Sequence, residues 1–174
     1  MRQWVYLTLI VLLALPTGAA AKTILPAPLT PSGCYANSEY GYSLTYPANW
    51  HAMPGPDGYL SLTNFTSESL GRNSLPAGGA KLELVPDVVA PPTVGKPFAV
   101  GIAGFPGMIS LETADSIGLL APGHSIQIFY QAAGRHWGVF GYFAEPVDQT
   151  NPNTRMFFAM VQSIRHTEII PEQR

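Results

Sequence analysis

The chain has 174 residues with 9 basic and 11 acidic side chains, which gives a formal net charge of −2. This near balance offers no electrostatic reason to bind nucleic acid or an anionic membrane surface. Apolar residues make up 47% of the chain and charged residues only 11%, so the composition excludes intrinsic disorder. The length suits one domain with a hydrophobic core.

Residues 1–21 predict a secretory signal peptide. Arg2 supplies a short positive region, the run from residue 4 to 15 is almost entirely apolar, and Ala19-Ala20-Ala21 offers small residues for cleavage before Lys22. The apolar run is shorter than the roughly 20 residues that a membrane span needs. We therefore expect a secreted or periplasmic protein whose mature chain does not span the membrane, with an uncleaved anchor as the alternative.

Residues 22–38 form a proline-rich segment that we interpret as a semi-rigid spacer, because Pro26, Pro28 and Pro31 leave little periodicity. Cys34 is the single cysteine, so no intrachain disulfide is possible. Pro31 stands where a lipidation motif needs an aliphatic residue. A free thiol is the favoured interpretation of Cys34, and pairing between chains or modification stays open.

Four strands are expected in the first half of the domain. Residues 41–46 alternate apolar and polar side chains until Pro47 ends the strand, and Trp50 follows the tight Pro-Ala-Asn corner as a large apolar residue that we expect to be buried. Comparable signals, separated by turn-forming Gly and Pro, predict strands over 50–53, 59–65 and 80–85.

Residues 86–106 contain much Gly and Pro and support a helix poorly, so 98–103 fits either a short helix or a weak strand. Strand-like pieces follow over 108–113 and 115–119. Residues 124–130 and 136–143 then predict an antiparallel hairpin that turns at 132–135, in which Gly138 and Gly141 permit either close approach or a bulge.

The single helix that the sequence predicts clearly begins after Asn153 or Thr154 as its capping residue and runs to about Arg165. Phe157, Met160, Val161 and Ile164 recur at the spacing that places them on one apolar face. Residues 169–174 are left as a tail.

Two stretches carry a resemblance to a known family. The run from Glu39 to Trp50, with its alternating strand, Tyr46-Pro47 and Trp50, resembles the opening of PsbP-like domains, named for an extrinsic protein of the photosynthetic oxygen-evolving complex. Gly134-Arg135-His136-Trp137 and the run 157–165 resemble that family's later strand and closing helix. The resemblance spans about 39–166 and implies a central antiparallel sheet with helical layers on its faces.

The predicted fold class is therefore α+β, with a central antiparallel sheet of about six strands in a PsbP-like α/β/α sandwich over residues 39–168. Composition alone also allows an all-β sandwich. We choose the α+β fold because of the resemblance.

The sequence offers no catalytic, cofactor-binding or metal-binding residue. Gly123-His124-Ser125 departs from a nucleophile elbow because Gln127 stands where the second glycine is needed and Ser125 begins a strand. The four histidines lack helical metal-site spacing; His124 and His136 flank the predicted hairpin and are expected to lie near one another across it. We assign no site residues and no cofactor.

Three functions remain. The first is an exported, non-catalytic PsbP-like binding or accessory module with a protein partner in the cell envelope. The second is a small-molecule or metal carrier that uses an aromatic pocket. The third is a secreted hydrolase whose site is assembled only by the fold. The sequence favours the first, because it contains an export signal and no recognisable catalytic set.

Overall fold

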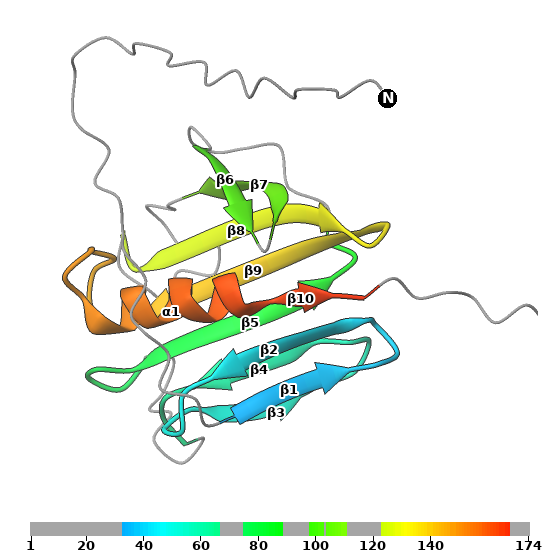
Figure 1. Cartoon of the computed structure of the whole chain (residues 1–174). Helices are drawn as coiled ribbons and strands as arrows, with labels where there is room; N and C mark the ends of the chain where they lie inside the picture. The colour runs from blue at the N-terminus through cyan, green and yellow to red at the C-terminus, as the bar shows by residue number, and fades with distance from the viewer. Residues whose placement is uncertain (1–32, 67–74, 89–97, 103, 111–122, 168–174) are drawn as a thin grey trace, which may run out of the picture.

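The computed structural model describes residues 33–66, 75–88, 98–102, 104–110 and 123–167 (Figure 1). These residues contain ten strands and one helix, and the strands form two antiparallel sheets. The small sheet has the order β1-β2-β10, and the large one has the order β3-β4-β5-β9-β8-β7-β6. The elements are β1 (Gly33–Asn37), β2 (Tyr42–Tyr46), β3 (His51–Pro54), β4 (Leu60–Thr63), β5 (Ala80–Pro86), β6 (Phe98–Ile102), β7 (Phe105–Ser110), β8 (Ser125–Ala132), β9 (Arg135–Phe143), α1 (Pro152–Ser163) and β10 (Arg165–His166).

The seven-stranded sheet has one strongly apolar face, which we call the inner face. Leu82 on β5, Ile128 on β8 and Val139 on β9 are fully buried there. Their sequence neighbours point to the opposite, outer face, because successive side chains of a strand alternate. The burial pattern of β5, in which buried and half-buried residues alternate from Ala80 to Pro86, records this period directly.

One layer covers the inner face, and it is built from both α1 and the three-stranded sheet. Figure 1 shows α1 lying in front of β9 and β5, while β1 and β2 lie in front of β3 and β4. The Phe157 ring of α1 packs where Gly141 leaves space, since a Cβ at Gly141 would lie 2.7 Å from that ring. Tyr42 of β2 meets Trp137 of β9 edge to face, with ring centroids 5.4 Å apart. Strand and helix therefore share one core.

The Tyr-Pro corner has the form that the sequence predicts. β2 ends at Tyr46, and the backbone N–H of Trp50 donates to the carbonyl of Pro47 at 3.0 Å, which closes the turn. Trp50 is 4% exposed and belongs to the core cluster. The predicted burial of Trp50 is confirmed.

The helix begins earlier than the sequence predicted. Asn151 is its capping residue: the side-chain oxygen accepts hydrogen bonds from the backbone N–H groups of Asn153 at 2.9 Å and Thr154 at 3.4 Å. Pro152 occupies the first turn, where a missing N–H costs nothing. The expected caps Asn153 and Thr154 are therefore inside the helix, and the chain beyond Ser163 becomes β10.

The predicted α/β/α sandwich is wrong. The structure is mostly β, with one short helix that shares its layer with a three-stranded sheet, and is nearer to the all-β alternative. The helical layers were inferred from the PsbP-like resemblance. Within the described residues only the stretch that became α1 combines the 3.6-residue apolar period with a cap, so the chain's own pattern supports no further helix there.

Other boundaries also shift. Residues 33–37 of the predicted spacer form β1, which pairs antiparallel with β2 from Gly33 opposite Tyr46 to Asn37 opposite Tyr42. The ambiguous stretch 98–103 contains a strand, β6. The predicted piece 115–119, the signal peptide 1–21 and the tail 169–174 lie outside the described residues. Within those residues, the model contains no helix with the length and apolar character needed to cross a membrane.

Candidate functional site

The β8–β9 hairpin positions the candidate site. Its loop consists of two residues, Ala133 and Gly134, with φ values of 50° and 74°. Two consecutive positive φ angles define the tight turn whose twist matches that of paired strands. The turn fixes the register, so that Gln131 lies directly opposite His136 and Phe129 opposite Gly138.

An open groove lies on the outer face beside this turn, and we call it the hairpin-end groove. Its volume is about 360 Å³. Apolar side chains from β7, from β8 and from the segment after β5 dominate the lining. Strand β7 also contributes backbone at its glycine. The lining residues are Val88, Pro106, Gly107, Met108, Phe129, Tyr130, Gln131 and His136.

Glycine and aromatic packing shape one side of this groove. Phe140 lies against Gly138, since a Cβ there would be 2.8 Å from the Phe140 ring and 3.4 Å from Val88. Phe140 in turn packs edge to face with Phe129, at 5.7 Å between ring centroids. The Phe129 ring is therefore held by a neighbour, and the close approach predicted for Gly138 is confirmed.

Two polar side chains meet at the hairpin end of the groove. Gln131 and His136 are both exposed, and their opposite positions in the register place their Cβ atoms on one face about 4.5–5.5 Å apart. Within the described part of the chain, neither side chain has a hydrogen-bond partner. An amide and an imidazole, each able to donate and to accept, are thus available to a ligand.

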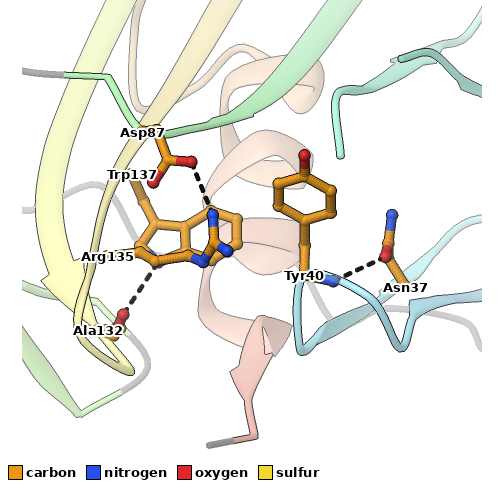
Figure 2. A network of polar contacts seen from close by, with 6 residues as sticks. All are labelled: Asn37, Tyr40, Asp87, Ala132, Arg135 and Trp137. Carbon is orange, nitrogen blue, oxygen red and sulfur yellow. Dashed lines mark hydrogen bonds and ion pairs between the residues drawn. The ribbon is translucent and has the colours of Figure 1, made fainter. Parts of the chain in front are cut away.

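A polar network fixes the chain next to the groove, as Figure 2 shows. Arg135 donates to the Asp87 carboxylate at 2.6 Å, and its guanidinium lies 4.9 Å from the centre of the Tyr40 ring. The Asp87 backbone N–H donates to the carbonyl of His136 at 2.7 Å. Asp87 has a φ of 58°, a left-handed conformation that turns the chain into Val88, a lining residue of the groove.

A second cluster surrounds His166 inside the fold. Its Nε2 lies 2.9 Å from the Tyr130 hydroxyl, and its ring centre is 4.5 Å from that of Trp137 and 5.8 Å from that of Phe105. Its Nδ1 is buried and has no hydrogen-bond partner in the described region. Burial lowers the pKa of His166 from 6.5 to about 4 and raises that of Tyr130 well above its usual value. Both groups are therefore neutral near pH 7, and the cluster holds β10 in place.

A third cluster lies further along the outer face. Glu83 accepts hydrogen bonds from Tyr59 at 2.6 Å and Tyr142 at 3.4 Å, and forms an ion pair with Lys81 at 2.5 Å. Burial and the Glu83 carboxylate raise the pKa of the Tyr59 hydroxyl well above its ordinary value. The carboxylate is thus saturated by its own neighbours, which makes it a structural anchor between the residue before β4, strand β5 and strand β9.

The expectation that His124 and His136 lie near one another is wrong. His124 stands just before β8 at the open end of the hairpin, where its Nδ1 is 3.1 Å from the carbonyl oxygen of Phe143. His136 faces Gln131 beside the turn. Six register pairs, from Ser125–Tyr142 to Tyr130–Trp137, separate them, because equal distances from the turn are what bring residues together in a hairpin.

The other sequence candidates are also placed. Ser125 begins β8, as expected, and is buried. Cys34 is an exposed free thiol on β1. The described residues contain no group of three or more His, Cys, Asp or Glu side chains that could hold a metal ion.

The groove and the His166 cluster were both missed by the sequence analysis. The period-2 pattern of 125–132 does separate Phe129 and Gln131 from Ile126, Ile128 and Tyr130. That signal identifies a second face, but it does not show which part of that face is hollow.

Comparison with known proteins adds little to this geometry. No protein-family model matches the sequence, and no curated protein is significantly similar to it. Among solved structures, a crystal structure from Bacteroides thetaiotaomicron VPI-5482 is similar at 10% identity with a TM-score of 0.44. The alignment covers 77% of this chain and 48% of that chain, so this chain spans about half the length of its neighbour. A likeness at this level supports no inference about function.

Proposed function

We propose that this chain is an exported, non-catalytic binding module, and that it recognises a component of the cell envelope or the extracellular space through the hairpin-end groove. The observation that carries the proposal is the groove itself: an open, mainly apolar hollow of about 360 Å³ with two polar side chains that have no partner among the described residues. Such a combination is typical of binding sites.

The export half of the proposal rests on the sequence of residues 1–21, with its positive start, apolar run and small residues before Lys22. The PsbP-like motif of residues 39–50 adds an accessory role to the proposal as a resemblance of sequence alone. N-terminal sequencing of the exported protein tests the first point. A species that starts near Lys22 supports it, and an intact Met1 in a cytoplasmic species contradicts it.

The proposal has two forms, which differ in the kind of component that is bound. A protein partner in the envelope is its first form. A small ligand, carried by the same groove, is the second, and the groove volume favours it: a stable protein interface needs about 800 Å² on each side, which exceeds what eight lining residues around one hollow provide. Within the described residues, no cluster of metal ligands supports a role as a metal carrier.

A hydrolase is the least supported alternative. General base catalysis needs an imidazole that reaches both a hydroxyl and an orienting group beside an open space. His166 reaches the Tyr130 hydroxyl, but the pair is enclosed by Trp137 and Phe105. This arrangement suits packing better than it suits chemistry.

Two methionines give a matched test of the groove. Met108 lines the groove and is 42% exposed, while Met53 lies on β3, outside the groove, and is 41% exposed. We expect Met108→Lys to weaken retention of the native envelope or extracellular component at least tenfold, because a charge would enter an apolar hollow. Met53→Lys should leave retention unchanged.

The readout is quantitative recovery of the component from native extracts, by protein and small-molecule mass spectrometry, on equal amounts of folded variant. Equal recovery by the two variants would show that the groove is not the recognition site. Turnover of an ester, peptide or glycoside substrate that depends on His166 would replace the binding module with an enzyme.

A further inference from the structure

The chemistry of the groove lining points to a class of ligand, and this inference rests on the proposed binding function. We infer that the hairpin-end groove takes a small, uncharged molecule with an apolar ring and one hydrogen-bonding group. The ring would lie against Phe129 and Met108, and the polar group would lie between Gln131 and His136.

The apolar side of the groove favours a ring. Phe129 presents an aromatic side chain held edge to face by Phe140, and Met108 stands directly opposite Phe129 in the β7–β8 register. A polarizable thioether beside an aromatic ring is a surface that favours flat, apolar groups. Gly107 contributes only backbone to this wall, because a Cβ there would face Tyr130 and Ile102 at 3.1 and 3.3 Å.

The polar side of the groove favours one hydrogen-bonding group. Gln131 and His136 are adjacent across the hairpin, both exposed, and both without a hydrogen-bond partner among the described residues. Together they can donate to and accept from a single hydroxyl or amide. The rest of the described lining is apolar side chains and strand backbone, so a second polar group on the ligand would lose water without a matching side chain there.

The absence of formal charge among the described lining residues favours an uncharged ligand. The eight lining residues that the structure describes include no Asp, Glu, Lys or Arg. Asp87 and Arg135, which precede the lining residues Val88 and His136 in the sequence, neutralise each other at 2.6 Å. A carboxylate or ammonium group would therefore give up its hydration with no opposite charge to replace it.

A set of four probes with one ring separates these features. Benzyl alcohol has the ring and a hydroxyl, toluene has the ring alone, benzoate adds a negative charge and benzylamine a positive one. We expect backbone amide NMR titration to show saturable shifts at Gly107, Met108, Phe129 and His136 with benzyl alcohol. Toluene should bind three- to tenfold more weakly at the same residues, and neither ion should saturate.

Variants assign the two sides of the site. Phe129→Ala should weaken benzyl alcohol and toluene at least tenfold, whereas Gln131→Ala with His136→Ala should remove the advantage of benzyl alcohol and leave toluene unchanged. Met108→Ala offers a second ring-side variant if Phe129→Ala does not fold. Met53→Ala is the control, and should bind all probes as the unmodified protein does.

The outcomes distinguish this inference from the proposed function. Saturation by benzoate or benzylamine in preference to benzyl alcohol, or no saturable binding by any probe, overturns the ligand class even if Met108→Lys still abolishes retention of the native component. Binding of benzyl alcohol that follows the expected variants sustains the ligand class, even if retention proves independent of the groove and the envelope function fails.

Discussion

The two faces of the seven-stranded sheet obey the same alternation but differ in what covers them. On the inner face, α1 and the three-stranded sheet bury residues such as Leu82, Val139 and Trp137 completely. On the outer face, Phe129 and Phe140 are only half-buried, and the hairpin-end groove lies beside them. The inner face thus stabilises the fold, whereas the outer face leaves aromatic side chains such as Phe129 and Phe140 partly exposed.

The sharpest test of this difference removes one large aromatic side chain from each face of β8–β9. Trp137→Ala should lower the free energy of unfolding by about 3–5 kcal/mol, because a fully buried ring is lost. Phe129→Ala should cost less than about 2 kcal/mol, since the ring is half-buried in the folded state. Urea denaturation of both variants measures the pair. Equal losses would mean that the outer face also belongs to the core.

His166 tests how tightly β10 seals the inner layer. Because its folded-state pKa is lowered to about 4, the unfolded state binds the proton more readily between pH about 6.5 and 4. The stability that depends on a neutral ring is therefore present above pH 6.5 and lost as the pH falls towards 4. For a half-buried group exposed to solvent screening, we expect a loss of about 1–2 kcal/mol.

The measurement compares urea midpoints at pH 7.5 and pH 4.5. His166→Phe should show a pH-dependent loss smaller than that of the unmodified protein by this amount, because the ring no longer titrates. His51→Phe, at an exposed position of β3, serves as the matched control. Its stability should change between pH 7.5 and pH 4.5 by as much as that of the unmodified protein. If His166→Phe and the unmodified protein lose the same stability between pH 7.5 and pH 4.5, then His166 is in contact with water.

The cap of α1 tests the helical part of the inner layer. Asn151→Ala removes the oxygen that accepts from Asn153 and Thr154, and should destabilise the protein by about 1 kcal/mol. Asn151→Asp retains the acceptor, loses only the exposed hydrogen bond that the side-chain amide donates to the Pro146 carbonyl, and should lose much less stability. Thermal or urea unfolding checks both, and a loss from Asp as large as that from Ala would show that the cap does not depend on this acceptor.

The Asp87–Arg135 pair, beside the hairpin turn, should have the smallest effect. A double-mutant cycle with Asp87→Asn and Arg135→Met should give a coupling of at most about 1 kcal/mol, because both partners are partly exposed. Asn tolerates the left-handed backbone of position 87, and Met retains apolar contact with Tyr40. A coupling that is undiminished in 1 M salt would contradict this account.

Local pattern predicted most of the described strands. The alternation of 41–46, 80–85 and 136–143, and the apolar face of 157–164, each correspond to an element of the structure. The spacer assignment failed at 33–37, because the three prolines before Cys34 concealed a five-residue strand that is stabilised by pairing with β2. The prediction of helical layers was wrong because it rested on the family resemblance, whereas the described residues contain one helix.

The candidate site could be predicted only in part. The sequence shows that Phe129 and Gln131 share one side of their strand, since alternation is a local property of the backbone. It does not show that Met108 from β7 and Val88 after β5 close around them. The error over His124 and His136 has the same origin, because the distance between two hairpin residues depends on register and not on their both flanking the strands.

By itself the sequence determined most of the described strands and the apolar face of the helix, because alternation, prolines, glycines and caps act within a few neighbours along the chain. Only the tertiary structure decided how the strands are shared between two sheets, that α1 and the small sheet form one layer, and that the outer face carries a groove. These features depend on contacts between residues far apart in the chain, such as Tyr42 with Trp137, whose pairing is favourable only after the whole core has formed.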